Sequence, residues 1–163
     1  MELYDSTAYS LSKILTNAYS TSFSLSMRLF SADICPHIYA IYGMVRIADE
    51  IVDTYTGKDQ RELLDAFEKE VKSAVKTGYS TNPIVHSFAL TAREFRIPMP
   101  LVTAFFKSMR MDLTNRTYDQ QSYETYIYGS AEVVGLMSLR VFTGDDALYN
   151  KLEKGASHLG AAY

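Results

Sequence analysis

The residues best suited to chemistry lie in segment 36–53, where polar side chains interrupt an otherwise apolar sequence. Tyr42, Arg46, Asp49 and Asp53 follow one another at spacings of four, three and four residues, so a helix places them on one face. Two carboxylates one turn apart repel each other and are costly to bury unless a cation lies between them. Carboxylate oxygens suit Mg²⁺, which commonly also binds substrate phosphates. The pattern therefore predicts a site where a divalent metal ion and Arg46 bind a phosphate group.

A purely structural interpretation of the same spacing stays open. In that alternative, Arg46 pairs with Asp49, and Asp53 is solvated near the end of the helix. Asp112, which follows Met109, Arg110 and Met111 on another mostly apolar segment, is likewise either a site residue or part of a polar C-terminal turn.

A third segment carries small residues within an apolar helix, namely Gly129, Ser130, Ala131 and Gly135. Small side chains let either a neighbouring helix or a long ligand approach the backbone closely, and spacing alone favours helix packing. Glu132 is the one charged residue between positions 129 and 137, so we expect it to have a partner such as an arginine or a metal-bound water.

The elements that must position these residues are all helices. Apolar periodicity and capping signals predict helices over 5–29 (with a break near residues 20–22), 34–54, 58–77, 82–95, 100–116, 121–143 and from 144–145 to the end. Helix 34–54 is apolar on nearly every side, which is typical of a buried central helix. No segment favours a strand and no linker divides the chain. We therefore expect one all-α helical domain over residues 1–163.

Composition narrows the class of protein. With 163 residues, 47% of them hydrophobic, and a net charge of −3, the chain is globular and has no basic surface for nucleic acid. A single cysteine, Cys35, excludes an internal disulfide and agrees with a reducing compartment. The sequence has no signal-peptide pattern and no apolar run long enough to span a membrane, so we expect a cytoplasmic protein. The three histidines are far apart, which argues against a zinc site.

Taken together, these segments resemble the squalene/phytoene synthase family. The similar blocks are Ser20-Thr21-Ser22-Phe23 and then residues 40–53, 109–113 and 126–137, in this order, with residues 158–163 similar to the start of a fifth block. The resemblance implies an isoprenoid synthase-type helical bundle of about twice this length. We therefore expect the chain to be the amino-terminal half of such a bundle, with the second aspartate motif expected beyond Tyr163.

The resemblance also implies an activity. Family members condense two prenyl diphosphates head to head through a cyclopropyl intermediate, using Mg²⁺, with Mn²⁺ as an alternative ion. The expected function is that of a phytoene synthase, which joins two geranylgeranyl diphosphates in carotenoid biosynthesis. One alternative is a squalene or dehydrosqualene synthase, and another is a non-catalytic helical assembly protein. Prenyl chain length and a requirement for NADPH stay open.

Individual roles follow from the resemblance as well. Asp49 and Asp53 correspond to the first aspartate motif and would be the metal ligands. The residues that would contact diphosphate are Arg46, Tyr42, Ser20 and Ser22, and those that would line the prenyl channels are Phe23, Met27, Tyr126, Ala131, Val134 and Gly135. Two positions depart from the family pattern: Glu132 stands where a glycine is usual, and Met27 where an aromatic residue is often found.

Three further expectations concern partners and state. The apolar product implies peripheral contact with a membrane. Without a second aspartate motif, the 163-residue chain alone is expected to be inactive. Helix 34–54 and the last helix, with Ala156, Leu159, Ala162 and Tyr163 on one face, would leave apolar surface uncovered, which predicts self-association.

Overall fold

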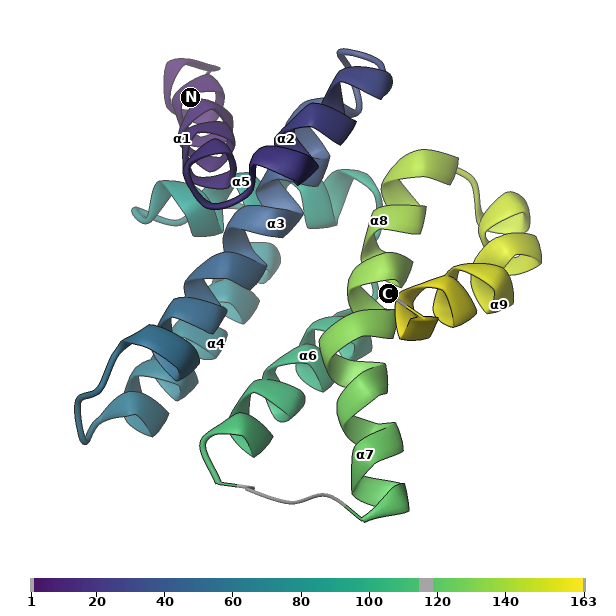
Figure 1. Cartoon of the computed structure of the whole chain (residues 1–163). Helices are drawn as coiled ribbons and strands as arrows, with labels where there is room; N and C mark the ends of the chain where they lie inside the picture. Colours follow the sequence, from purple (N-terminus) through teal and green to yellow (C-terminus); the bar gives the residue numbers. More distant parts are fainter. Residues whose placement is uncertain (1, 115–118, 163) are drawn as a thin grey trace.

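The structure is a computed structural model that describes residues 2–114 and 119–162, apart from the side chain of Ser24. Within these residues the chain forms helices and no strands (Figure 1), as the sequence predicts. The elements are α1 (Glu2–Tyr19), α2 (Thr21–Ser26), the 3₁₀ turn η1 (Met27–Leu29), α3 (Cys35–Asp49), the π-helical turn η2 (Glu50–Thr54), α4 (Gln60–Thr77), α5 (Pro83–Glu94), α6 (Met99–Asp112), α7 (Gln120–Ile127), the π-helical turn η3 (Tyr128–Glu132), α8 (Val133–Thr143) and α9 (Asp146–Ala162).

Local sequence explains where several helices begin and end. The predicted break in the first helix occurs at Ser20, whose side chain accepts a hydrogen bond of 3.2 Å from the backbone N–H of Phe23 and so caps α2. Asn82 caps α5 in the same way, ahead of Pro83 in the first turn. Gly78 ends α4 with φ of 84°, a left-handed conformation that glycine adopts without strain.

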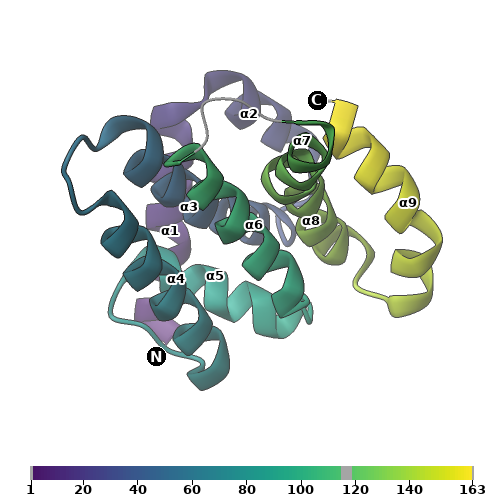
Figure 2. The same cartoon turned by 90° about the horizontal axis from the view of Figure 1, so that it is seen from below.

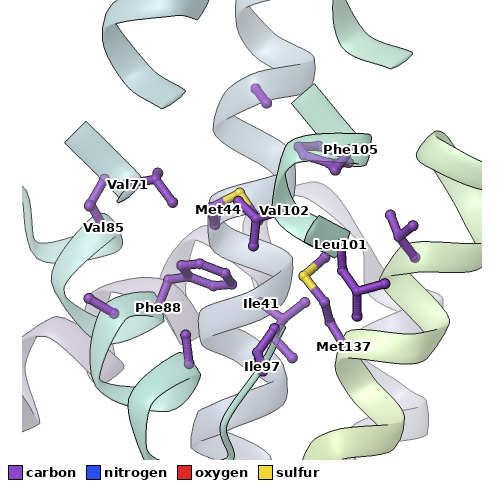
Figure 3. Close-up of a cluster of buried hydrophobic side chains, with 14 of the residues drawn as sticks. Ile41, Met44, Val71, Val85, Phe88, Ile97, Leu101, Val102, Phe105 and Met137 are labelled. Atoms are coloured by element: carbon purple, nitrogen blue, oxygen red, sulfur yellow. The ribbon is translucent and has the colours of Figure 1, made fainter. Parts of the chain in front are cut away.

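Helix α3 is the central helix, as its apolar sequence predicts. It packs against α1, α5, α6 and α8. Figure 3 shows part of the core around it, where Ile41 and Met44 of α3 meet Phe88 of α5, Val102 of α6 and Met137 of α8. All five side chains are at most 1% exposed. A rigid core therefore fixes α3, whose C-terminal end carries the predicted acidic residues.

Helix α6 lies between α4 on one side and the η3–α8 segment on the other, and Figures 1 and 2 show this from two directions. Helix α9 packs against α8 and η3.

Two predicted helices differ from the observed ones. The predicted helix 121–143 consists of three segments, since the π-helical turn η3 separates α7 from α8. Helix α6 ends at Asp112, short of the predicted residue 116, and residues 115–118 lie outside the described part of the chain.

Two further properties concern the apolarity of the helices and the single cysteine. Among the described residues, no helix combines the length and the apolarity needed to cross a membrane. Cys35 is a free thiol, and its Sγ donates a hydrogen bond of 3.2 Å to the carbonyl of Met27.

Candidate functional site

The acidic residues lie where α3 ends. Asp49 is the last residue of α3 and is half-buried, whereas Asp53 lies in the π-helical turn η2 and is exposed. A π-helical turn has more residues per turn than an α-helix, and such turns are frequent at functional sites. The structure thus places one carboxyl at the protein surface and one just below it.

The electrostatics of Asp49 show which charges surround it. Burial raises the pKa of Asp49 from 3.8 to about 6, Arg46 opposes this rise, and the charges of Asp53, Asp112 and Glu50 add to it. Asp112 is the last residue of α6, which contacts both α3 and η2, so the charges that act on Asp49 come from three elements. The sequence places Asp112 in one of the family-like blocks but does not show that it faces Asp49.

Arg46 is the cation of this group. It forms an ion pair with Glu50, one helical turn further on. The structural alternative predicted a pair with Asp49, and its choice of partner is therefore wrong. The guanidinium also lies over the ring of Tyr19, with 4.2 Å between its Cζ and the ring centroid. The Nε of Arg46 is buried and has no hydrogen-bond acceptor among the described residues.

Four of the predicted site residues lie before α3, in or next to α2 and η1. Phe23 of α2 stacks on Tyr42 of α3, with ring centroids 4.9 Å apart and planes 28° from parallel. Ser20 caps α2, and the exposed Ser22 accepts a hydrogen bond at its carbonyl from Ser26. Met27 is 2% exposed and belongs to the core. The predicted contacts of Ser20 and Ser22 with diphosphate, and of Met27 with a prenyl chain, stay predictions.

The remaining predicted residues lie on three elements later in the chain. Tyr126 lies on α7, Ala131 on η3, and Val134 and Gly135 on α8. A Cβ on Gly135 would lie 3.3 Å from the carbonyl oxygen of Ala156, so this part of α8 packs closely on α9. The expected close packing of helices at these small residues is therefore confirmed, whereas their role in lining a prenyl channel stays a prediction.

Glu132 has a partner of a different kind from the expected one. The hydroxyl of Ser157 on α9 donates a hydrogen bond to its carboxylate. The expectation of an arginine or a metal-bound water is thus replaced by a neutral donor from the last helix. Sequence reasoning missed this contact because 25 residues separate the two partners.

The acidic group has the donor chemistry for a hard divalent cation. Its oxygens come from Asp49 and Asp53, and the charge of Asp112 acts on Asp49 as well. Within the described residues, no three acidic, histidine or cysteine side chains come together as a complete metal site. An ion such as Mg²⁺ typically takes only one or two carboxylates and completes its shell with water and phosphate oxygens. The residues therefore fit a metal ion that binds together with a phosphorylated ligand.

Comparisons with known proteins identify a family that matches most of the chain. The family model described as squalene/phytoene synthase matches residues 16–163. A phytoene synthase from Arthrospira platensis is 30% identical over 138 residues, which cover 83% of this chain and 44% of that protein. A presqualene diphosphate synthase from Zymomonas mobilis subsp. mobilis is 27% identical over 154 residues, which cover 91% of this chain and 50% of that protein. The chain thus spans about half the length of the curated relatives it matches.

Solved structures show the same fold. A dehydrosqualene synthase solved in complex with a ligand superposes with a TM-score of 0.84 at 19% identity, over 97% of this chain and 54% of the other. A squalene synthase from Alicyclobacillus acidocaldarius superposes with a TM-score of 0.85 at 24% identity, over 96% and 58%. The helical arrangement and the match over residues 16–163 lead to one conclusion: this chain belongs to the squalene/phytoene synthase family.

Proposed function

We propose that this protein is a prenyl transferase that joins two geranylgeranyl diphosphates head to head, as a phytoene synthase does, and that it works with Mg²⁺ or Mn²⁺. The observation that carries the proposal is the position of Asp49 at the end of the buried helix α3, one turn after Arg46, with Asp53 in the following turn η2. Both α3 and η2 contact α6, whose last residue is Asp112. The relative named a phytoene synthase supports the choice of substrate.

The residues of the acidic group have distinct parts in this proposal. Asp49 and Asp53 would hold the metal ion, which when bound neutralises charge on the diphosphate as it leaves. Arg46 would donate hydrogen bonds to a diphosphate oxygen, and its buried Nε offers a donor with no acceptor among the described residues. The stacked rings of Phe23 and Tyr42 would present aromatic surface to a prenyl carbocation and help to exclude water.

A shorter substrate is the alternative, because other relatives are named presqualene diphosphate, squalene and dehydrosqualene synthases. Such proteins would accept C15 in place of C20 chains. The measurement that separates the two is competition between farnesyl and geranylgeranyl thiodiphosphate for binding. Tighter binding of the C15 compound would overturn the choice of geranylgeranyl diphosphate but leave the metal site intact.

We further propose that the 163 residues bind a diphosphate without turning it over. The proposed metal ligands, Asp49 and Asp53, belong to one aspartate motif at the end of α3 and in η2. Stabilising a leaving diphosphate requires charge neutralisation on both of its sides. Losing even one such interaction commonly costs about 10²–10³-fold in rate. Incubation with geranylgeranyl diphosphate and Mg²⁺ should therefore yield no phytoene above a boiled control, and product above that control would contradict this proposal.

The metal assignment is tested with Asp49→Asn and Asp53→Asn. Both substitutions keep the size of the side chain and remove its charge, so each should abolish Mg²⁺-dependent binding of inorganic pyrophosphate in calorimetry. The matched control is Asp145→Asn, since Asp145 caps α9 by accepting a hydrogen bond from the N–H of Leu148 and asparagine caps equally well. Unchanged affinity in both site variants would overturn the metal assignment and favour a non-catalytic assembly protein.

Partners and oligomeric state belong to the proposal as well. We propose peripheral contact with a membrane that accepts the apolar product.

Self-association is proposed from the exposed face of α9. Its residues Leu148, Leu152 and Leu159 are 43%, 42% and 70% exposed, and such apolar surface favours self-association. Tyr163, also predicted on this face, lies outside the described residues. Light scattering should give a mass above 18.4 kDa, and a monomer would contradict self-association.

A further inference from the structure

Tyr19 was not among the residues predicted for the site, yet it contacts Arg46. It is the last residue of α1, 47% exposed, and its ring centroid lies 4.2 Å from the Cζ of Arg46. An arginine over a tyrosine face is held by the negative charge density of the ring. The ring therefore supports the guanidinium from one side.

The packing of α1 along α3 sets the position of Tyr19. The two helices contact each other in order along both sequences: Tyr9 meets His37 with ring centroids 5.3 Å apart, and a Cβ on Gly43 would lie 3.1 Å from the Oγ of Ser12. Tyr19 follows about two turns after Ser12. Its place over Arg46 is thus a consequence of close helix packing and of the break at Ser20, which ends α1 at this point.

Arg46 is also held from a second direction. Its terminal nitrogen Nη2 pairs with Glu50, while its Nε is buried without an acceptor among the described residues. A guanidinium has five N–H donors in a fixed planar arrangement. Fixing this plane between a ring and a carboxylate leaves other donors available for a ligand.

We propose that Tyr19 is a positioning residue: its ring, together with Glu50, holds the guanidinium of Arg46 in the orientation that receives a diphosphate. Long side chains lose rotamer freedom when they bind a ligand, and holding Arg46 in place beforehand reduces that loss. The inference rests on the proposed function, because it concerns how the same site binds diphosphate. It adds a residue from α1 to a site otherwise built from α2, α3, η2 and α6.

The test measures binding of inorganic pyrophosphate with Mg²⁺ by calorimetry. Tyr19→Leu and Tyr19→Gln both remove the ring, and each should weaken binding about two- to fivefold, the range expected for a cation–π contact at an exposed site. Tyr19→Phe keeps the ring and should restore most of the affinity. Tyr123→Leu is the matched control, because Tyr123 is a similarly exposed tyrosine, 52% accessible, on α7.

A double-mutant cycle separates positioning of Arg46 from a general structural effect. In an Arg46→Gln background, Tyr19→Leu should change pyrophosphate affinity by less than about 1.5-fold, because the group that it positions is gone. An equal loss in both backgrounds, or no loss in either, would overturn the role of Tyr19. If Asp49→Asn abolishes binding while the Tyr19 variants bind as tightly as the native chain, only this inference fails. A native chain that binds no pyrophosphate would overturn the proposed function and this inference together.

Discussion

The two π-helical turns, η2 and η3, share a backbone irregularity and differ in how exposed and how closely packed they are. Turn η2 ends a helix, and its residues Asp53 and Thr54 are exposed. Turn η3 lies between α7 and α8 and contacts both α6 and α9. A Cβ on Gly129 of η3 would lie 2.5 Å from the carbonyl oxygen of Ala104, and a Cβ on Gly160 would lie 2.9 Å from the Cα of Glu132.

This difference shows two uses of one local geometry. In η2 the wider turn carries acidic side chains outward at the end of a buried helix, where their charge is available to a ligand. In η3 it brings backbone against backbone, and small residues are needed because any side chain would separate the helices. Substitutions in η2 should therefore weaken ligand binding, and substitutions in η3 should lower the free energy of unfolding.

The largest effect on stability is expected at Gly129. Gly129→Ala places a methyl group against Ala104 and Ser108, so α6 and η3 must move apart. We expect the free energy of unfolding to fall by about 2–4 kcal/mol. Gly155→Ala is the control, because a Cβ there meets nothing within 4 Å and alanine favours a helix interior. Urea denaturation in which both variants behaved alike would remove the distinction between the turns.

Asp49 directly precedes η2, and its ionised carboxylate should lower the free energy of unfolding. Its pKa is raised by burial from 3.8 to about 6, so the folded chain binds more protons than the unfolded chain in this window and stability falls as pH rises through it. Asp49→Asn removes the charge, and solvent screening of the half-buried group limits the gain to about 1–2 kcal/mol at neutral pH. The difference between variant and native chain should vanish near pH 4. A difference independent of pH would contradict this assignment.

The contact between Glu132 and Ser157 should have a smaller effect. Ser157→Ala leaves the half-buried carboxylate of Glu132 without this donor, which should cost about 1 kcal/mol of stability. In a Glu132→Ala background the same substitution should cost less than half as much, because its partner is absent. Equal costs in both backgrounds, measured by urea denaturation, would show that the hydrogen bond does not hold α9 to η3.

The smallest effect on stability is expected at Asp53. Its side chain is exposed at the end of η2, so Asp53→Asn should change the free energy of unfolding by less than about 0.5 kcal/mol. The same substitution should abolish Mg²⁺-dependent binding of pyrophosphate. A large loss of stability would mean that η2, like η3, serves the packing of the fold.

Much of the fold can be predicted from local sequence. The first helix breaks near residues 20–22 as predicted, and Asn82 caps α5 ahead of Pro83. The all-round apolar pattern of segment 34–54 likewise predicts the buried central helix. The π-helical turns cannot be predicted in this way. Each adds one residue to a helical turn, and in a segment that is apolar on most sides this leaves the apolar periodicity almost unchanged. The division of segment 121–143 into α7, η3 and α8 is therefore visible only in the structure.

For the candidate site as well, some features follow from the sequence and others only from the tertiary structure. The sequence by itself predicted one face with Tyr42, Arg46, Asp49 and Asp53, because a helical period of 3.6 residues would place them there. This period applies to the first three, which lie on α3, whereas Asp53 lies in the π-helical turn η2. Only the tertiary structure decided which other elements act on these residues: the charge of Asp112 from α6, and the ring of Tyr19 from the end of α1. Local periodicity acts within one helix, whereas contacts between α1, α3 and α6 depend on how their buried faces pack, which no spacing along the chain specifies.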